Sequence, residues 1–152
     1  MSQRDLSEHF TYDEFTATQH NDLQDENRAE GLMHLADLTA TAQVAEQVRA
    51  LFGGPLVIHC AFRCKRLNDA VGSQDHSQHL VGQAFDFHVQ DLGADDTHLR
   101  AALHTIAGSG IKFHQLLIER GCLHLGTFKP GAPNGEVAWW DKGTKVIYTA
   151  AA

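Results

Sequence analysis

The chain has 152 residues, of which 43% are hydrophobic and 20% are charged, and its formal net charge is −7 at pH 7. This length and composition are typical of one soluble globular domain, so we expect a single domain over residues 1–152. The acidic balance argues against nucleic acid as a partner, because phosphate binding needs a basic surface, and no stretch is apolar enough to insert into a membrane.

The first 29 residues are polar apart from a few large apolar side chains. Thr11 stands before Asp13 and Glu14, a pattern that marks the start of a short helix. We expect residues 1–29 to form an arm that docks on the domain through its aromatic side chains, with an irregular surface loop over residues 19–28. The opening residues lack the apolar core of a signal peptide, so we expect synthesis in the cytoplasm without a leader.

Residues 30–52 carry the clearest helical pattern. Apolar residues recur there at intervals of three and four, which predicts an amphipathic helix with a core-packing role. Gly53-Gly54-Pro55 then ends the helix. The apolar stripe consists of Leu35, Leu38, Ala42, Ala45, Val48 and Phe52.

Two strands are predicted in the middle of the chain. Residues 55–62 are rich in β-branched side chains, and residues 63–71 follow as a loop with a short helical turn. Residues 84–89 alternate strictly, which places Phe85 and Phe87 on the core face and Asp86 on the other face.

The last third of the chain is predicted to contain one helix and three strands. Asp95 caps a helix that continues to about Ala107. The strands cover residues 115–119, 123–127 and 146–149, and Trp139-Trp140 is expected in the connection before the last strand. The resulting class is α+β, with helices flanking a small, mostly antiparallel sheet.

His79 and Asp86 are the first candidate metal ligands. They are seven residues apart, which is roughly 10 Å of rise on a helix, whereas each ligand of a Zn²⁺ ion must bring an atom to about 2 Å from it. A loop that carries His79, a turn at Gly82 and a strand that carries Asp86 suit such a site better.

The segment around residues 119–124 supplies a third ligand. A two-residue hairpin loop at Gly121-Cys122 would be a type II′ turn and would place Glu119 directly opposite His124. His79, Asp86 and His124 with one open position would form a catalytic zinc site, at which Glu119 could take a proton from bound water.

The motif Ser77-x-His79-x-x-Gly82-x-Ala84-x-Asp86 resembles the zinc-ligand signature of the D-alanyl-D-alanine peptidases. The resemblance covers nearly the whole chain, and its opening is similar to that of short phage and prophage members. The further segments that carry it are Leu6–Thr11, Phe62-Arg63-Cys64, Leu67-Asn68, Gln115–Glu119 and Leu123-His124-Leu125. Many relatives have a tryptophan just before the second histidine, where this chain has Gly121-Cys122-Leu123.

This resemblance implies the compact fold shared by hedgehog-type and lysostaphin-type domains, and a peptidase that cuts peptidoglycan stem peptides. It implies a carboxypeptidase, a dipeptidase or an endopeptidase. Such an enzyme would degrade the cell wall after release in the manner of a phage endolysin or on a particle, or would act as a cytoplasmic dipeptidase. The implied roles are zinc binding by His79, Asp86 and His124, and general base for Glu119. Arg63 would have a catalytic or substrate-binding role, balancing charge near the scissile carbonyl or a terminal carboxylate, and Ser77 would hydrogen-bond the substrate or support the zinc ligands.

Several alternatives stay open at this point. A non-catalytic zinc-stabilised binding or virion-structural module on the same fold would use the same ligands. Neither the bond that is cut nor the oligomeric state is indicated. His88 has no assigned role, and Cys60, Cys64 and Cys122 are predicted to be buried free thiols.

Overall fold

The computed structural model describes residues 5–148 and divides the chain into two compact units. Of the described residues, 5–46 and 60–85 make up the first unit, and 47–59 and 86–148 make up the second. Each unit is described by itself, and the expectation of a single domain stays a prediction. Among residues 5–148, no helix combines the length and the apolar character that crossing a bilayer requires.

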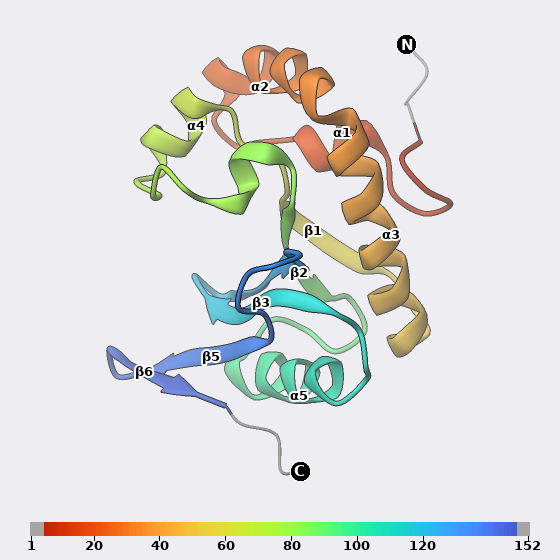
Figure 1. Cartoon of the computed structure of the whole chain (residues 1–152), viewed down its shortest axis with the longest axis vertical. Helices are drawn as coiled ribbons and strands as arrows, with labels where there is room; N and C mark the ends of the chain where they lie inside the picture. The colour runs from red at the N-terminus through yellow and green to blue at the C-terminus, as the bar shows by residue number, and fades with distance from the viewer. Residues whose placement is uncertain (1–4, 149–152) are drawn as a thin grey trace. The chain divides into compact units, whose positions relative to one another are not determined.

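The first unit is helical (Figure 1). Its short opening helix begins after Thr11, whose hydroxyl accepts a hydrogen bond from the Glu14 backbone N–H as predicted. Phe10 and Phe15 contact each other with ring centroids 5.7 Å apart, and both are buried within the unit. Its elements are α1 (Tyr12–Thr16), η1 (Asn21–Leu23), α2 (Gln24–Gly31), η2 (Leu32–His34), the first part of α3 (Leu35–Phe52), α4 (Lys65–Ala70) and η3 (Gln78–Val81).

The prediction of an irregular loop over residues 19–28 is wrong, because η1 and most of α2 occupy this stretch. Helix α2 has no apolar stripe by which a sequence pattern could find it. The residues that it buries are Asn27 and Gly31. Acidic residues in its first turn and Arg28 in its last turn instead suit the helix dipole.

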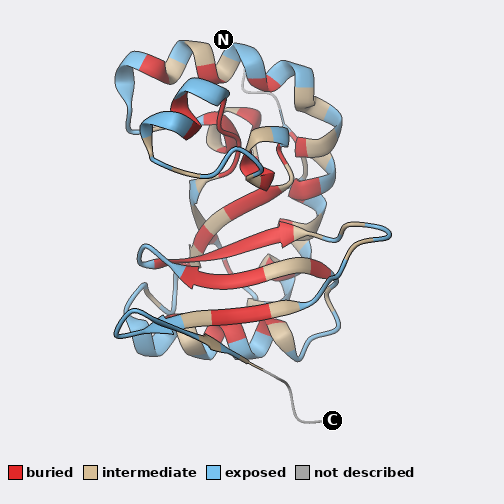
Figure 2. Ribbon diagram, turned by 60° about the vertical axis from the view of Figure 1, so that its left-hand side comes forward, coloured by how far each residue is buried: buried red, intermediate tan, exposed pale blue. Residues whose placement is uncertain are grey.

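The second unit is built on a six-stranded sheet with strand order β1-β2-β4-β3-β5-β6. Helix α5 (Asp96–Ala107) packs against β3 and β4, and the Asp95 side chain caps it as predicted. Figure 2 shows the central strands as largely buried. The strands are β1 (Leu56–Cys60), β2 (Ala84–Val89), β3 (Phe113–Glu119), β4 (Cys122–Thr127), β5 (Glu136–Asp141) and β6 (Thr144–Ile147).

The α+β class is confirmed, but the sheet is mixed rather than mostly antiparallel. Strand β3 pairs antiparallel with β4 and parallel with β5, and β5 pairs antiparallel with β6. Trp139 and Trp140 lie on β5 itself, so placing them in a connection was wrong. The predicted last strand is found as β6, and Thr149 lies outside the described residues.

The alternation predicted for residues 84–89 is confirmed. Phe85, Phe87 and Val89 are buried on β2, whereas Asp86 and His88 on the other face are half-buried.

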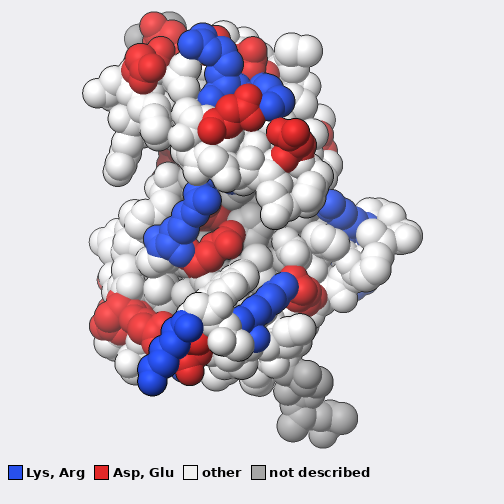
Figure 3. All heavy atoms as spheres, turned by 90° about the vertical axis from the view of Figure 1, so that its left-hand side faces the viewer, with Lys and Arg blue, Asp and Glu red and all other residues white. Residues whose placement is uncertain are grey.

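The face of the molecule shown in Figure 3 carries acidic and basic side chains interspersed with one another, and neither sign forms one large patch there.

Candidate metal and substrate site

His79 lies on η3 in the first unit, and its neighbours in sequence hold it there. The Ser77 hydroxyl accepts a hydrogen bond from the His79 backbone N–H at 3.2 Å and so caps this turn. Gly82 ends it with a φ of 74°, a left-handed conformation that glycine adopts without strain. The turn predicted at Gly82 is therefore confirmed.

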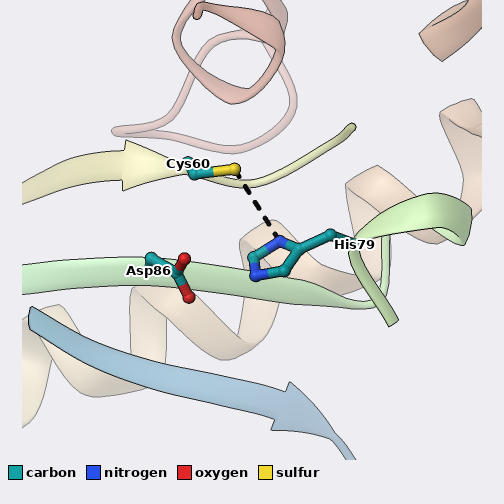
Figure 4. Close-up of side chains that lie close together, drawn as sticks. All are labelled: Cys60, His79 and Asp86. Carbon is teal, nitrogen blue, oxygen red and sulfur yellow. Dashed lines mark hydrogen bonds between the residues drawn. The ribbon is translucent and has the colours of Figure 1, made fainter. Parts of the chain in front are cut away.

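The His79 ring is almost fully buried, and its Nδ1 atom lies 2.5 Å from the carbonyl oxygen of Ala61. Because a carbonyl oxygen only accepts hydrogen bonds, Nδ1 carries a proton, and in the neutral ring the lone pair is then on Nε2. The Cys60 thiol also faces Nδ1, at 4.0 Å, as Figure 4 shows. A histidine fixed through one ring nitrogen by a backbone carbonyl is a common form of metal ligand.

Arg63 lies beside His79 in the same unit. The Arg63 backbone N–H donates to the His79 carbonyl at 3.0 Å, and its Nη2 atom lies 3.4 Å from the Ser77 hydroxyl. The Arg63 residue is only 7% exposed, and its Nε atom has no hydrogen-bond partner. No carboxylate among residues 5–148 forms an ion pair with it. Such a buried guanidinium is suited to an anionic ligand.

Asp86 and His124 meet in the second unit. They project from β2 and β4, which are neighbours in the sheet, and His124 Nδ1 lies 2.8 Å from Asp86 Oδ1. Adjacent ligands around a tetrahedral zinc ion are about 3.4 Å apart, since each lies about 2.1 Å from the ion. The Nδ1–Oδ1 distance of 2.8 Å is that of a hydrogen bond and is shorter than this spacing, so the two predicted ligands lie side by side and contact each other directly.

The predicted register of the β3–β4 hairpin is wrong. The two-residue loop begins one residue earlier than predicted, so Glu119 is not opposite His124. The observed pairs are Glu119 with Cys122 and Leu117 with His124. Arg120 and Gly121 form the loop with φ values of 54° and 76°, and positive φ at both positions indicates a type I′ turn rather than type II′. Arg120 therefore adopts a left-handed conformation that Asn and Gly adopt more readily, and this is why the sequence did not predict the turn.

In the observed register, Glu119 lies on the same face of the sheet as His124 but is displaced from it along the strand. Because side chains alternate, Glu119, Cys122 and His124 share one face, and Glu119 is diagonal to His124 rather than opposite it. Its side chain is exposed and lines a cavity of about 320 Å³ with Trp140 and Asp96.

The other candidate residues have partners of their own. His88 Nδ1 lies 2.7 Å from His59 Nε2 across neighbouring strands. Burial lowers the pKa of His88, and the nearby charge of His59 lowers it further. All three cysteines are free as predicted, but Cys60 is only half-buried.

Cys64 is the most enclosed of the three thiols. Its Sγ donates a hydrogen bond to Glu26 Oε2 at 3.6 Å. Burial raises the pKa of this thiol, and the charges of Glu30 and Glu26 raise it further. Cys64 is therefore a protonated thiol at neutral pH.

A comparison with protein families decides the assignment. The family model described as Peptidase M15 matches residues 8–124, which run from within the N-terminal arm to His124. The chain belongs to the peptidase M15 family. No curated protein matches it. Peptidase M15 members are typically zinc-dependent metallopeptidases of the D-Ala-D-Ala carboxypeptidase type, so the resemblance seen in the sequence is confirmed at the level of the family.

Sequence reasoning found the motif of this peptidase M15 member but missed two residues around it. Ala61 acts through its backbone carbonyl, which leaves no signal in the residue type. Asn27 lies on the helix that was not predicted. The assignment of His79, Asp86 and His124 to one zinc ion stays a prediction.

Proposed function

We propose that the protein is a zinc metallopeptidase that hydrolyses an amide bond in peptidoglycan stem peptides, as a D-Ala-D-Ala carboxypeptidase or an L-Ala-D-Glu-type endopeptidase. The observation that carries the proposal is the pairing of His79 with Arg63. A buried histidine with a fixed tautomer and a buried guanidinium without a carboxylate partner share a backbone hydrogen bond. A metallopeptidase that recognises a carboxylate-bearing peptide needs both groups.

The proposed metal ligands are His79, Asp86 and His124. Two imidazoles and one carboxylate form the donor set of an open catalytic zinc site. The residues fit such an ion, because the proton on His79 Nδ1 leaves Nε2 as the ligand atom of the neutral ring, and Asp86 and His124 lie side by side on neighbouring strands. A bound zinc ion would polarise the scissile carbonyl and lower the pKa of a bound water.

Glu119 is the proposed general base. It would accept the proton of the attacking water as the water oxygen bonds to the carbonyl carbon. It would then return the proton to the amine as the C–N bond breaks. Arg63 would hold a substrate carboxylate through its Nε and Nη donors, and the Ser77 hydroxyl would orient Arg63 or hydrogen-bond to the substrate.

The test is incubation of the zinc-loaded protein with purified cell walls, followed by mass spectrometry of the released peptides. We expect new stem-peptide fragments or free D-alanine, and the product masses identify the bond. Glu119→Gln should keep stoichiometric zinc and lose roughly 10²–10⁴-fold in turnover. Glu136→Gln is the matched control, because Glu136 is paired with Gln115 and Lys145 away from the ligands. Unchanged turnover in Glu119→Gln would remove Glu119 from the mechanism.

One observation favours a second function, a non-catalytic zinc-stabilised binding or virion-structural module. Glu119 is exposed and diagonal to His124, which is a less direct placement for a general base than the predicted one. Full zinc occupancy and cell-wall binding without any released fragment would establish this second function.

We also propose that the protein reaches the cell wall after phage-type release or as part of a particle. The similarity of residues 6–11 to the opening of short phage members supports this setting. Immunoblotting of purified particles against the soluble lysate distinguishes the two routes, and detection of the protein in neither fraction would contradict both.

A further inference from the structure

Asn27 is a fully buried amide in the first unit, and every hydrogen-bonding group of its side chain is used. Its Nδ2 atom donates to the carbonyl oxygens of Thr16 at 2.7 Å and Phe62 at 3.1 Å. Its Oδ1 atom accepts from the Cys64 backbone N–H at 2.7 Å. Two acceptors on one side and one donor on the other fix the orientation of the amide.

Two of these three bonds flank Arg63. Asn27 binds the carbonyl of the residue before Arg63 and the N–H of the residue after it. The Phe62 backbone N–H also donates to the Phe15 carbonyl at 2.9 Å, and that of Arg63 donates to the His79 carbonyl. The backbone of three consecutive residues is therefore fixed, and the Asn27 side chain holds both ends of this segment.

We propose that Asn27 is a positioning residue that aims the Arg63 guanidinium at the substrate carboxylate. This inference rests on the proposed function. Arg63 has a rigid fork of donors, so recognition of a carboxylate depends on its direction as well as its charge. The neighbouring hydrogen bond to Ser77 is long at 3.4 Å, so the side chain depends on its backbone for that direction. Small displacements of a positioned group cost binding steeply.

The experiment compares two probes that differ in one group, N-acetyl-D-alanine and N-acetyl-D-alaninamide. Each is titrated into the zinc-loaded, ¹⁵N-labelled full chain, and the Arg63 Nε–Hε signal is followed by NMR. In the wild type we expect the carboxylate to bind about tenfold or more tighter than the amide and to shift this signal. Arg63→Gln should abolish the preference.

Asn27→Ala should reduce the carboxylate preference by about tenfold while its zinc content stays unchanged. The control is Thr16→Val, which loses a buried hydrogen bond to the Tyr12 carbonyl in the same region but leaves every bond of Asn27 in place. It should keep the preference, which separates positioning from general destabilisation. If Asn27→Ala does not fold, Asn27→Ser, which keeps a polar group, replaces it.

The outcomes separate the two proposals. A folded Asn27 variant that keeps the wild-type preference, while Arg63→Gln loses it, overturns the role of Asn27 alone. A wild type that binds both probes equally, with no effect of Arg63→Gln, overturns the assignment of Arg63 and the role of Asn27 with it. Loss of the preference in Thr16→Val as well as in Asn27→Ala would also contradict a specific role for Asn27.

Discussion

The Nδ1 atom of His79 donates its proton to the carbonyl oxygen of Ala61, the residue that follows β1. The bond links the first histidine of the motif to the backbone. Because a carbonyl oxygen only accepts hydrogen bonds, this bond places a proton on Nδ1. The predicted ligand atom is consequently Nε2.

This geometry predicts how His79 binds zinc. In the zinc-loaded protein, long-range ¹H–¹⁵N NMR should show Nδ1 protonated and Nε2 coordinated, and His79→Ala should lose stoichiometric zinc by elemental analysis. His76→Ala is the control, because His76 is exposed and close in sequence. A full equivalent of zinc retained by His79→Ala would disprove the ligand assignment.

The type I′ turn predicts that the β3–β4 hairpin can be stabilised at Arg120. A left-handed conformation costs a non-glycine residue roughly 1–2 kcal/mol, and Asn tolerates it best. Arg120→Asn should therefore raise the free energy of unfolding by about 0.5–1 kcal/mol in urea titrations. Lys142, with a φ of 52° before Gly143 in the β5–β6 hairpin, offers the same substitution at a second turn. Stabilisation by Lys142→Asn but not by Arg120→Asn would contradict the observed register.

Sequence patterns predicted the elements that bury regular apolar stripes and missed those that do not. Helix α3, helix α5 and the alternating strand β2 were found because their period is visible in the residues. Helix α2 was missed because it buries an amide, and β5 because Pro133, Asn134 and Gly135 before it indicate a loop. The same holds for the candidate site. His79 and Asp86 were predicted from their sequence motif, whereas the register of the hairpin that carries His124 was not, because it depends on a turn with Arg120 in a left-handed conformation.

Gly82 is predicted to be irreplaceable for two separable reasons. Its φ of 74° is strained for any other residue, and an added Cβ would lie 3.0 Å from Leu38 Cγ and Cδ2 in the fully packed core. Gly82→Ala should therefore destabilise the protein by about 2–4 kcal/mol, the sum of backbone strain and overpacking. It should also weaken zinc binding, because the same turn places His79.

Gly72 supplies the control for the backbone term. Its φ is 75°, almost the same, but a Cβ there would meet nothing within 4 Å. Gly72→Ala should cost only about 1 kcal/mol in urea unfolding and leave zinc affinity unchanged. Equal losses in the two variants would mean that contact with Leu38 contributes nothing.

Glu46 is predicted to make the docking of the N-terminal arm depend on pH. Burial raises the pKa of Glu46, but hydrogen bonds from the Ser7 hydroxyl at 2.6 Å and from the His9 ring and backbone N–H at 2.7 Å outweigh it and lower the pKa below its ordinary value. A lowered folded-state pKa stabilises the protein above the unfolded value of about 4.3, and this contribution is lost as the pH falls through the folded value.

Glu46→Gln should therefore reduce the free energy of unfolding by about 1–2 kcal/mol at pH 7, and the difference from the wild type should shrink below about pH 4. Urea titrations at both pH values measure it. Glu8→Gln is the control, because the Glu8 side chain is 84% exposed and approaches His9 only to 3.9 Å, so its removal should change little at either pH. A Glu46→Gln deficit that stays constant down to pH 3 would show that the carboxylate charge does not hold the arm, since the contribution of that charge declines once the pH falls below the unfolded value of about 4.3.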